Sequence, residues 1–597
     1  MDIFGVFSML GGLALFLYGM ELMGDGLEKA SGGRLERILE KLTSNPIKAV
    51  LLGCGVTAVI QSSSATTVMV VGFVNSGIMK LEQAVGLIMG ANVGTTMTAW
   101  LLSLTGIEGG SFIMELLKPS SFSPILAVIG IIFIMFMKKD EQKRNIGSVL
   151  VGFAILMTGM DTMSAAVKPL ANVPEFTALF TMFSNPILGL LVGALVTAII
   201  QSSSASVGIL QALSATGAIS FGSALPIIMG QNIGTCVTAM ISGIGANKNA
   251  RRTALVHLYF NIVGTVAFMI VFYAVNSVVQ FGFMNGPATA MNIAIIHTVF
   301  NLFATCLLLP FSKLLVKLAC MTVKDDPVAE AEPTIEERAF RHLDPRFLET
   351  PGYAVEQCKR TAVDMAKHAT DGLLMSLDLL ENFDEDKAKK VKDLEDLVDR
   401  YEDELGSYMV KLSHAPLSKY DNHTISLLLH SIGDLERISD HSMNILSAAE
   451  EMKEKGMIFS EEGKGELRVF VNAVSEILDL TVSAFEKNDT KRAAFVEPLE
   501  EVIDDLNTMV KANHIKRLQR GICTIEQGFV LSDISTNLER VSDHCSNIAI
   551  SVIEIDRDGF DAHGYLENLK KDNDPQFIGL VENYRRKYVL PTTEAAE

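Results

Sequence analysis

The chain has 597 residues, of which 49% are hydrophobic, with a mean hydropathy of +0.32 and a net charge of −19. Residues 1–322 hold 17 Lys and Arg against 13 Asp and Glu, whereas residues 323–597 hold 33 against 56. This division predicts an apolar membrane domain followed by a soluble part whose acidity argues against nucleic acid as a partner.

The termini and cysteines add two expectations. The seven cysteines show neither paired nor metal-type spacing, which argues against a disulfide framework and fits a reducing compartment for the soluble part. The N-terminus has no basic leader and no convincing cleavage site, so we expect it to begin an uncleaved membrane span.

Apolar runs near the ~20 residues needed to cross a bilayer follow one another through the first part. Two of them, 47–78 and 187–218, are interrupted at the centre by the polar runs Gln61–Ser64 and Gln201–Ser204. Each arm holds ~14 residues, about 21 Å of helix, which is too short to cross alone. We therefore expect two re-entrant hairpins and full crossings near 3–23, 84–105, 123–137, 146–163, 224–243, 253–278 and 289–312.

The polar runs belong to a duplication, in which each matching segment is displaced along the chain by the same offset as Gln201 from Gln61. The constant offset predicts two repeats of one design, at about 3–137 and 146–278, and an extra span at 289–312. The matching segments are Gln61-Ser62-Ser63-Ser64 with Gln201-Ser202-Ser203-Ser204, Ser44-Asn45-Pro46 with Ser184-Asn185-Pro186, and Gly90-Ala91-Asn92-Val93-Gly94-Thr95 with Gly230-Gln231-Asn232-Ile233-Gly234-Thr235.

The distribution of Lys and Arg predicts the orientation of the spans. Loops 24–46, 138–145 and 244–252 are rich in basic residues, whereas loops 106–122 and 164–186 hold one each. The N-terminus is then outside and residues 323–597 are cytoplasmic. Because 24–46 and its repeat partner 164–186 fall on opposite sides, we expect the two repeats to be inverted.

Inverted repeats with broken helices are typical of secondary transporters, whose site lies near the membrane midplane. Helix ends there offer N–H groups to an anion, and hydroxyl and carbonyl oxygens to a hard cation. The Asp, Glu or His relays that proton coupling usually requires are nearly absent from the spans. The residues therefore favour a neutral, oxygen-rich site for an anion and sodium.

The doubled Gln-Ser-Ser-Ser motif, each copy followed by Gly-x-Asn-x-Gly-Thr, resembles the type II family of sodium–phosphate cotransporters over about residues 1–312. The resemblance implies sodium-coupled transport of inorganic phosphate across the cell membrane by alternating access. The second copy has Ser206-Val207 in place of Thr66-Thr67, so the two halves cannot contribute identically. The resemblance implies sodium- and phosphate-binding roles for Gln61, Ser62, Ser63, Ser64, Gln201, Ser202, Ser203 and Ser204, with Asn92, Thr95, Asn232 and Thr235 lining the same cavity.

Two alternatives stay open for the polar residues of the spans. Asn92 and Asn232 could instead support the hairpins at the break. The pairs His257 with Asn261 and His297 with Asn301 each share one helical face, which favours hydrogen bonds between helices.

The second part begins with a polar, proline-containing linker at 323–351 and ends with a tail at 564–597 that holds a short helix. Between them, a domain at 352–563 contains amphipathic periods that predict six helices in two three-helix bundles. The predicted helices are 352–383, 386–413, 420–456, 463–488, 490–519 and 523–557.

This second part is also duplicated, since the segment Leu435–His441 returns further along the chain as Leu538–His544. The Glu-Arg-x-Ser-Asp-His pattern resembles the PhoU family over about 352–557, which implies a module that regulates phosphate uptake and can carry metal. Carboxylates four residues apart repel one another, and oxygen ligands with His nearby would suit Mg, Mn, Fe or Zn. The alternative is a solvated acidic face paired with arginine. The candidate ligands are Glu395, Asp399, Glu436, Asp440, Glu500, Asp504, Glu539 and Asp543.

The sequence thus predicts an all-α, multi-pass sodium–phosphate transporter with a cytoplasmic PhoU-like regulatory module. Its expected partners are phosphate, sodium, the lipid bilayer, and a cytoplasmic regulatory protein or a second copy of the chain. The alternative is a membrane phosphate sensor that signals through the bundles without net transport. An enzyme is not expected, because neither a nucleophile–base pair nor a phosphate-binding glycine loop is evident.

Overall fold

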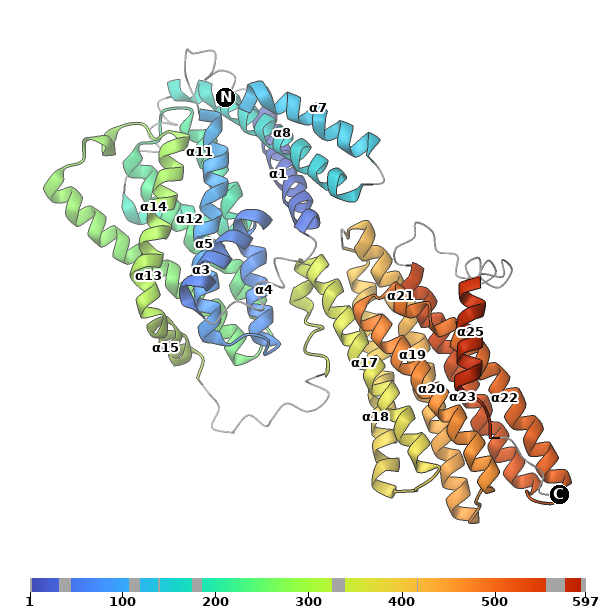
Figure 1. Ribbon diagram of the computed structural model, residues 1–597. Coiled ribbons are helices and arrows are strands. Elements are labelled where there is room, and N and C mark those ends of the chain that lie inside the picture. The colour runs from blue at the N-terminus through green and yellow to red at the C-terminus, as the bar shows by residue number, and fades with distance from the viewer. Residues whose placement is uncertain are drawn as a thin grey trace. The chain divides into compact units, whose positions relative to one another are not determined.

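A computed structural model describes residues 3–31, 45–106, 119–137, 140–173, 185–324, 339–415, 417–554 and 575–591. Over these ranges the chain is almost entirely helical and contains no β-strand, which confirms the predicted all-α class (Figure 1). It divides into two compact units, Met1–Ala331 with Asp344–Tyr353, and Glu332–Leu343 with Ala354–Glu597. Parts of the predicted loops 24–46 and 138–145, of the linker and of the tail lie outside the described residues. The orientation inferred from charge stays a prediction.

Six helices in the described part of the first unit are long and apolar enough to cross a membrane. The run predicted at 123–137 forms a shorter helix, α7 (Pro119–Phe136). The six are α1 (Ile3–Ser31), α5 (Leu81–Ser103), α8 (Glu141–Val167), α12 (Phe221–Ser242), α13 (Lys248–Val279), and α14 (Ala290–Leu308) with its continuation through α15 (Ser312–Thr322).

The break predicted at the centre of each interrupted run is present. Helix α3 (Pro46–Ile60) stops at Gln61, which has a left-handed backbone with φ of 60°, and α4 (Ser63–Asn75) follows. Helix α10 (Pro186–Ile200) stops at Gln201, with φ of 58°, before α11 (Ser203–Ser214). Each pair of arms is in contact. A left-handed residue ends a helix and reverses its direction, which explains why both runs break at Gln.

The glycines of the Gly-x-Asn-x-Gly-Thr motifs let helices pack closely. A Cβ on Gly90 would lie 2.0 Å from the carbonyl oxygen of Val50, and one on Gly230 would lie 2.0 Å from that of Leu190. No side chain fits at such a distance, so glycine is needed where α5 crosses α3 and where α12 crosses α10. The repeated motif is therefore partly a packing device.

The other helices of the first unit surround this arrangement. Helices α1 and α8 pack along their length, with α7 beside α8, as Figure 1 shows. Glycines permit this contact too, because a Cβ on Gly19 would lie 2.3 Å from the backbone nitrogen of Leu156. Helices α5 and α12 lie between the hairpins, since each contacts arms of both as well as α13 and α14.

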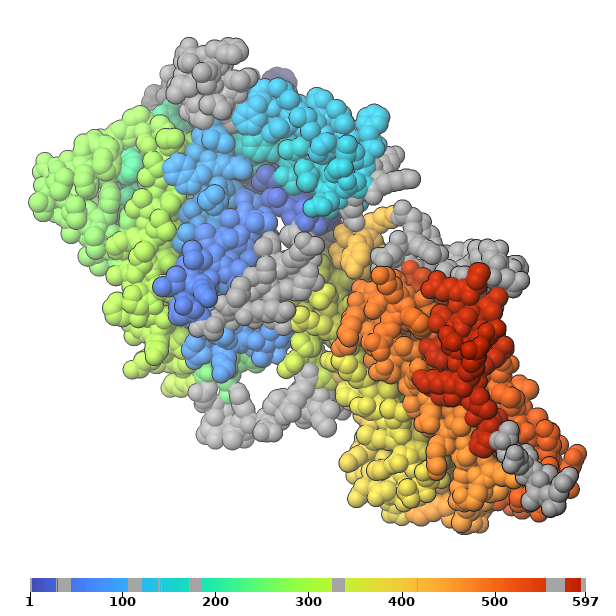
Figure 2. Space-filling view, viewed as in Figure 1, coloured from blue at the N-terminus to red at the C-terminus, as the bar shows by residue number. Residues whose placement is uncertain are grey.

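The second unit is a bundle of long amphipathic helices, and all six predicted segments are present, the fifth as the pair α21 and α22. The C-terminal helix α25 (Pro575–Lys587), red in Figure 2, packs against α22. The helices are α17 (Pro351–Leu379), α18 (Glu385–Leu412), α19 (Lys419–Lys455), α20 (Glu461–Lys487), α21 (Thr490–Ala493), α22 (Val496–Gln519) and α23 (Ile525–Glu554).

Candidate functional site

Each Gln-Ser-Ser-Ser motif places the start of a helix inside the first unit. The Ser62 hydroxyl caps α4 by accepting from the backbone N–H of Ala65 at 3.1 Å, and Ser202 caps α11 by accepting from Ala205 at 3.2 Å. The next N–H groups, those of the second and third serines, have no acceptor within their helix. Both motifs therefore present free N–H groups and the positive end of a helix dipole, which suits an anion.

Around the first motif, the side chains hold one another in place. Gln61 accepts a hydrogen bond from the Thr98 hydroxyl of α5 at 2.7 Å and donates to the carbonyl of Ala58. Thr57 of α3 donates to Thr66 of α4 at 3.1 Å, a buried contact between the two arms. The polar groups of the first hairpin are thus largely satisfied within the protein.

The polar side chains around the second motif make fewer hydrogen bonds to one another. Gln201 is exposed, and the hydroxyls of Thr197 and Ser206, which correspond to Thr57 and Thr66, are enclosed but have no hydrogen-bond partner. Ser203 and Ser204 are both buried. Buried hydroxyls without partners are costly, so the second hairpin offers groups that a ligand or water can satisfy.

The four residues predicted to line the cavity are all buried on α5 and α12. The amide groups of Asn92 and Asn232 donate back to carbonyls four residues earlier in their own helices, at 2.9 and 3.0 Å, and the hydroxyls of Thr95 and Thr235 do the same at 3.0 Å. These bonds use the amide nitrogen of each asparagine, so its side-chain oxygen remains the acceptor for other partners. The Asn232 oxygen lies 3.4 Å from Nε2 of His297 on α14, an interhelical contact of the predicted kind.

Both hairpins contact the central pair α5 and α12. Gln211 of α11 donates to the carbonyl of Ala99 on α5 at 3.0 Å, and Gln231 of α12 donates to the carbonyl of Ser206 on α11 at 3.0 Å. Val71 of α4 belongs to the same apolar cluster as Ala239 of α12. Each hairpin thus packs on a helix from the other repeat.

Sequence reasoning missed the threonines that brace the motifs, Thr57, Thr66 and Thr98. The duplication carried a signal for two of them. Thr57 and Thr98 recur as Thr197 and Thr238, at the same offset that relates Gln61 to Gln201.

In the second unit, the candidate metal ligands form two triads, each with ligand oxygens within 4.8 Å of one another: Glu395, Asp399 and Asp440, and Glu500, Asp504 and Asp543. Glu436 and Glu539 belong to neither triad, and Glu436 pairs with Arg437 at 3.4 Å. Partial burial, followed by the nearby Asp440 charge, raises the pKa of Asp399, and burial followed by Asp399 raises the pKa of Glu395. The first triad thus has the self-repulsion that a bound cation would relieve.

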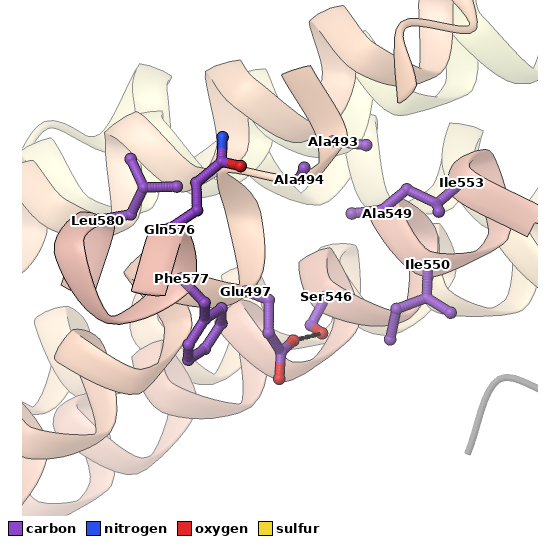
Figure 3. A pocket seen from close by; sticks show the side chains of 10 residues that line it. All are labelled: Ala493, Ala494, Glu497, Ser546, Ala549, Ile550, Ile553, Gln576, Phe577 and Leu580. Carbon is purple, nitrogen blue, oxygen red and sulfur yellow. Dashed lines mark hydrogen bonds between the residues drawn. The ribbon is translucent and has the colours of Figure 1, made fainter. Parts of the chain in front are cut away.

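A third acidic group, Glu497 with Glu500 and Glu501, extends the second triad and was not predicted. Glu497 accepts a hydrogen bond from Ser546 at the edge of a cavity of about 190 Å³, between α21, α23 and α25 (Figure 3). The first bundle gives no hint of Glu497, because Lys392 occupies the place three residues before Glu395.

Both parts of the chain match known protein families. Residues 15–165 and 155–293 match the Na+/Pi-cotransporter family, and residues 362–449 and 467–552 match the PhoU domain. The chain carries a Na+/Pi-cotransporter domain and a PhoU domain. Both resemblances inferred from the motifs are therefore confirmed, and each domain matches twice, as the duplications predicted.

Similar proteins match most of this chain or one part of it. The inorganic phosphate export protein YjbB of Salmonella typhimurium is 26% identical over 92% of this chain and 97% of its own length. The sodium-dependent phosphate transport protein 2A of Rattus norvegicus is 23% identical over 43% of this chain and 59% of its own. The crystal structure of PhoU from Pseudomonas aeruginosa covers 34% of this chain and 99% of that chain at 22% identity, with a TM-score of 0.33. The chain is thus a membrane protein of a phosphate transporter family whose members are transporters, not enzymes.

Proposed function

We propose that the protein carries inorganic phosphate across the membrane with sodium by alternating access, and that its PhoU domain regulates this transport. The observation that supports the proposal most is the pair of serine-capped helix N-termini, at Ser62–Ser64 and Ser202–Ser204, on hairpins that share the helices α5 and α12. Asn92, Thr95, Asn232 and Thr235 lie on those shared helices and complete the proposed site.

Charge explains why sodium would accompany phosphate. The segments 61–76 and 201–214 contain no charged side chain, so the positive ends of two helix dipoles are the main compensation that the hairpins offer. Each dipole end is worth about half an elementary charge, or roughly one charge in total. A phosphate dianion would retain about one uncompensated charge, which sodium bound to hydroxyl and carbonyl oxygens would neutralise.

We also propose that the two hairpins enter the membrane from opposite sides, with the N-terminus outside and the PhoU domain in the cytoplasm. Helix α4 ends at Asn75, which is bonded to Asn247 at the start of α13. The turn after α11 contains Ile219, whose carbonyl accepts from Ala288, beyond the end of α13. The second arms of the two hairpins, α4 and α11, thus end near opposite ends of α13. These ends are far apart, because α13 has 32 residues and spans about 48 Å.

Flux of labelled phosphate in proteoliposomes tests the proposal. Purified protein should move phosphate when a sodium gradient is imposed in either direction, and should not respond to an equal potassium gradient or carry sulfate at a comparable rate. Phosphate binding without flux would favour the sensor hypothesis, and indifference to both sodium and phosphate would reject transport.

We further propose that the two acidic triads of the PhoU domain bind a divalent cation such as Mn²⁺. Each triad brings together three carboxylates from two helices, which supports this proposal. The pKa values of Glu395, Asp399 and Asp543 are also raised. Arg437, which lies 3.2 Å from Asp440, provides the competing arrangement of an arginine-paired acidic face.

A further inference from the structure

A short segment before the PhoU domain packs into the membrane unit. Residues Asp344–Tyr353, here called the anchor segment, belong to the first unit, although the residues on either side of them belong to the second. The anchor segment contains the 3-10 helix η5 (Pro345–Glu349) and the first three residues of α17. A segment whose polar composition predicts a linker is thus a packed part of the transport unit.

Three aromatic rings make the apolar half of this contact. Phe347 and Tyr353 of the anchor segment and Phe73 of α4 are fully buried, with ring centroids 5.0 to 5.6 Å apart. A Cβ on Gly72 would lie 2.8 Å from the Phe347 ring, so the ring occupies the space that this glycine leaves. The cluster fixes the segment against the second half of α4.

Hydrogen bonds connect the same segment to two further helix ends. The Asp344 carboxylate accepts from the side-chain amide of Asn75 at 2.6 Å, and Arg346 donates to the carbonyl of Ser242, at the end of α12, at 2.8 Å. The Asn75 oxygen in turn accepts from the backbone N–H of Asn247, the N-cap of α13, at 2.8 Å. Asp344 and Arg346 also form an ion pair at 3.0 Å, which is largely buried. The anchor segment therefore joins the ends of α4, α12 and α13.

The second hairpin lacks the residues that contact the anchor segment in the first. At the offset that relates the two repeats, Ala212, Leu213 and Ala215 replace Gly72, Phe73 and Asn75. Ala212 has the Cβ that would collide with a ring placed like Phe347, and Ala215 cannot donate as Asn75 does. Of the two hairpins, only the first therefore has the residues that contact the anchor segment, although the motifs at the hairpin tips are the same.

We propose that Phe347 and Asp344 are positioning residues for the phosphate site, because they fix α4 and through it the N–H groups at Ser63 and Ser64. This inference rests on the transport function proposed above. Gly72 is nine residues from Ser63, about 14 Å along a short rigid helix, so a shift at one end of α4 is carried to the other. Since α17 continues from the anchor segment into the PhoU domain, we expect movement of that helix to act directly on α4 through Phe347 and Asp344.

The test compares Phe347→Ala with Phe340→Ala in the full chain. Phe340 precedes the anchor segment and packs on Tyr401 in the second unit, so it is a matched control in the same stretch of sequence. Hydrogen exchange of α4 should become at least about tenfold faster in Phe347→Ala, while α11 stays within about twofold of wild type. Phe347→Leu should restore most of the protection, and Phe340→Ala should leave both helices unchanged.

Transport kinetics supply a measurement that would not change if the anchor segment only covered α4 without positioning it. A loosened α4 populates the binding-competent arrangement less, so the KM for phosphate should rise about fivefold in Phe347→Ala while the maximal rate changes less than about twofold. Unchanged exchange in α4, equal loosening of α11, or faster exchange with an unchanged KM would each overturn the inference. The exchange arm needs no flux, so wild-type protein that carries no phosphate would reject the proposed function and leave the anchoring of α4 to be decided by exchange.

Discussion

The two hairpins share a motif but differ in how their polar groups are satisfied. In the first, Gln61 is bonded to Thr98 and Thr57 is bonded to Thr66 across the arms. In the second, Gln201 is exposed and the hydroxyls equivalent to the threonine pair have no partner. A duplicated sequence has thus produced one braced hairpin and one with unused hydrogen-bonding capacity.

This difference suggests a division of labour within the proposed site. A braced helix N-terminus is already oriented for an anion, so it loses little entropy when the anion binds. Buried groups without partners favour a second arrangement in which a ligand or water satisfies them. We therefore expect the first hairpin to act as the fixed wall of the site and the second to change more during transport.

The largest expected effect on stability concerns the closely packed glycines that both repeats share. Gly90→Ala and Gly230→Ala each place a Cβ 2.0 Å from a carbonyl oxygen, and we expect each to cost about 3 kcal/mol of stability, measured by melting in detergent. Gly55→Ala on α3 is the control, because a Cβ there meets nothing within 4 Å. Tolerance of either alanine at the close crossings would mean that the motif glycines are not needed for packing.

Replacing the motif glutamines by asparagine should affect the stability of the two hairpins differently. Asn retains the amide and tolerates the left-handed backbone, but it cannot reach as far. We expect Gln61→Asn to lose the Thr98 bond and about 1 kcal/mol of stability, whereas Gln201→Asn melts like wild type. Phosphate flux should fall about tenfold in both, because each amide lies beside a serine-capped helix start. Normal flux in both variants would remove the glutamines from the site.

The hydroxyls give a sharper contrast because their effects on stability differ in sign. Thr66→Val leaves the buried hydroxyl of Thr57 without its acceptor and should cost about 1 kcal/mol. Ser206→Ala removes a buried hydroxyl that has no partner, so stability should be unchanged or rise by about 0.5 kcal/mol. A loss of stability in Ser206→Ala would show that the hydroxyl is already satisfied and that the hairpins are alike.

Periodicity and repetition were enough to predict most of the fold. A polar run inside an apolar stretch predicts a break wherever two arms are each too short to cross, and the structure breaks at Gln61 and Gln201. The amphipathic helices of the PhoU domain follow the apolar period closely, since their buried faces recur every three to four residues. Local sequence was sufficient because these features depend on neighbouring residues.

Contacts between distant residues were not predictable in the same way. Thr98 meets Gln61 only because α5 packs on α3, and a single sequence does not state which threonine faces the tip. The anchor segment looks like a linker because Asp344-Pro345 is polar and breaks helices, whereas Phe347 is buried against Phe73, which lies far earlier in the chain. The differences between the two halves lie in such long-range contacts.

The smallest expected effect on stability is in the PhoU domain, where a residue of the first acidic triad is compared with one outside it. The pKa of Asp399 is raised, so the folded state holds its proton more tightly than the unfolded state does, and the charged triad costs stability above that pKa. Asp399→Asn should therefore stabilise the metal-free chain at pH 7 by a few tenths of a kcal/mol, and the gain should vanish as the pH falls and the wild-type carboxyl is protonated. Mn²⁺ should raise the melting temperature of wild type more than that of the variant. Asp396→Asn, on the same helix but outside the triad, should keep the full response to Mn²⁺. If both variants respond like wild type, the first triad is a solvated acidic face and not a metal site.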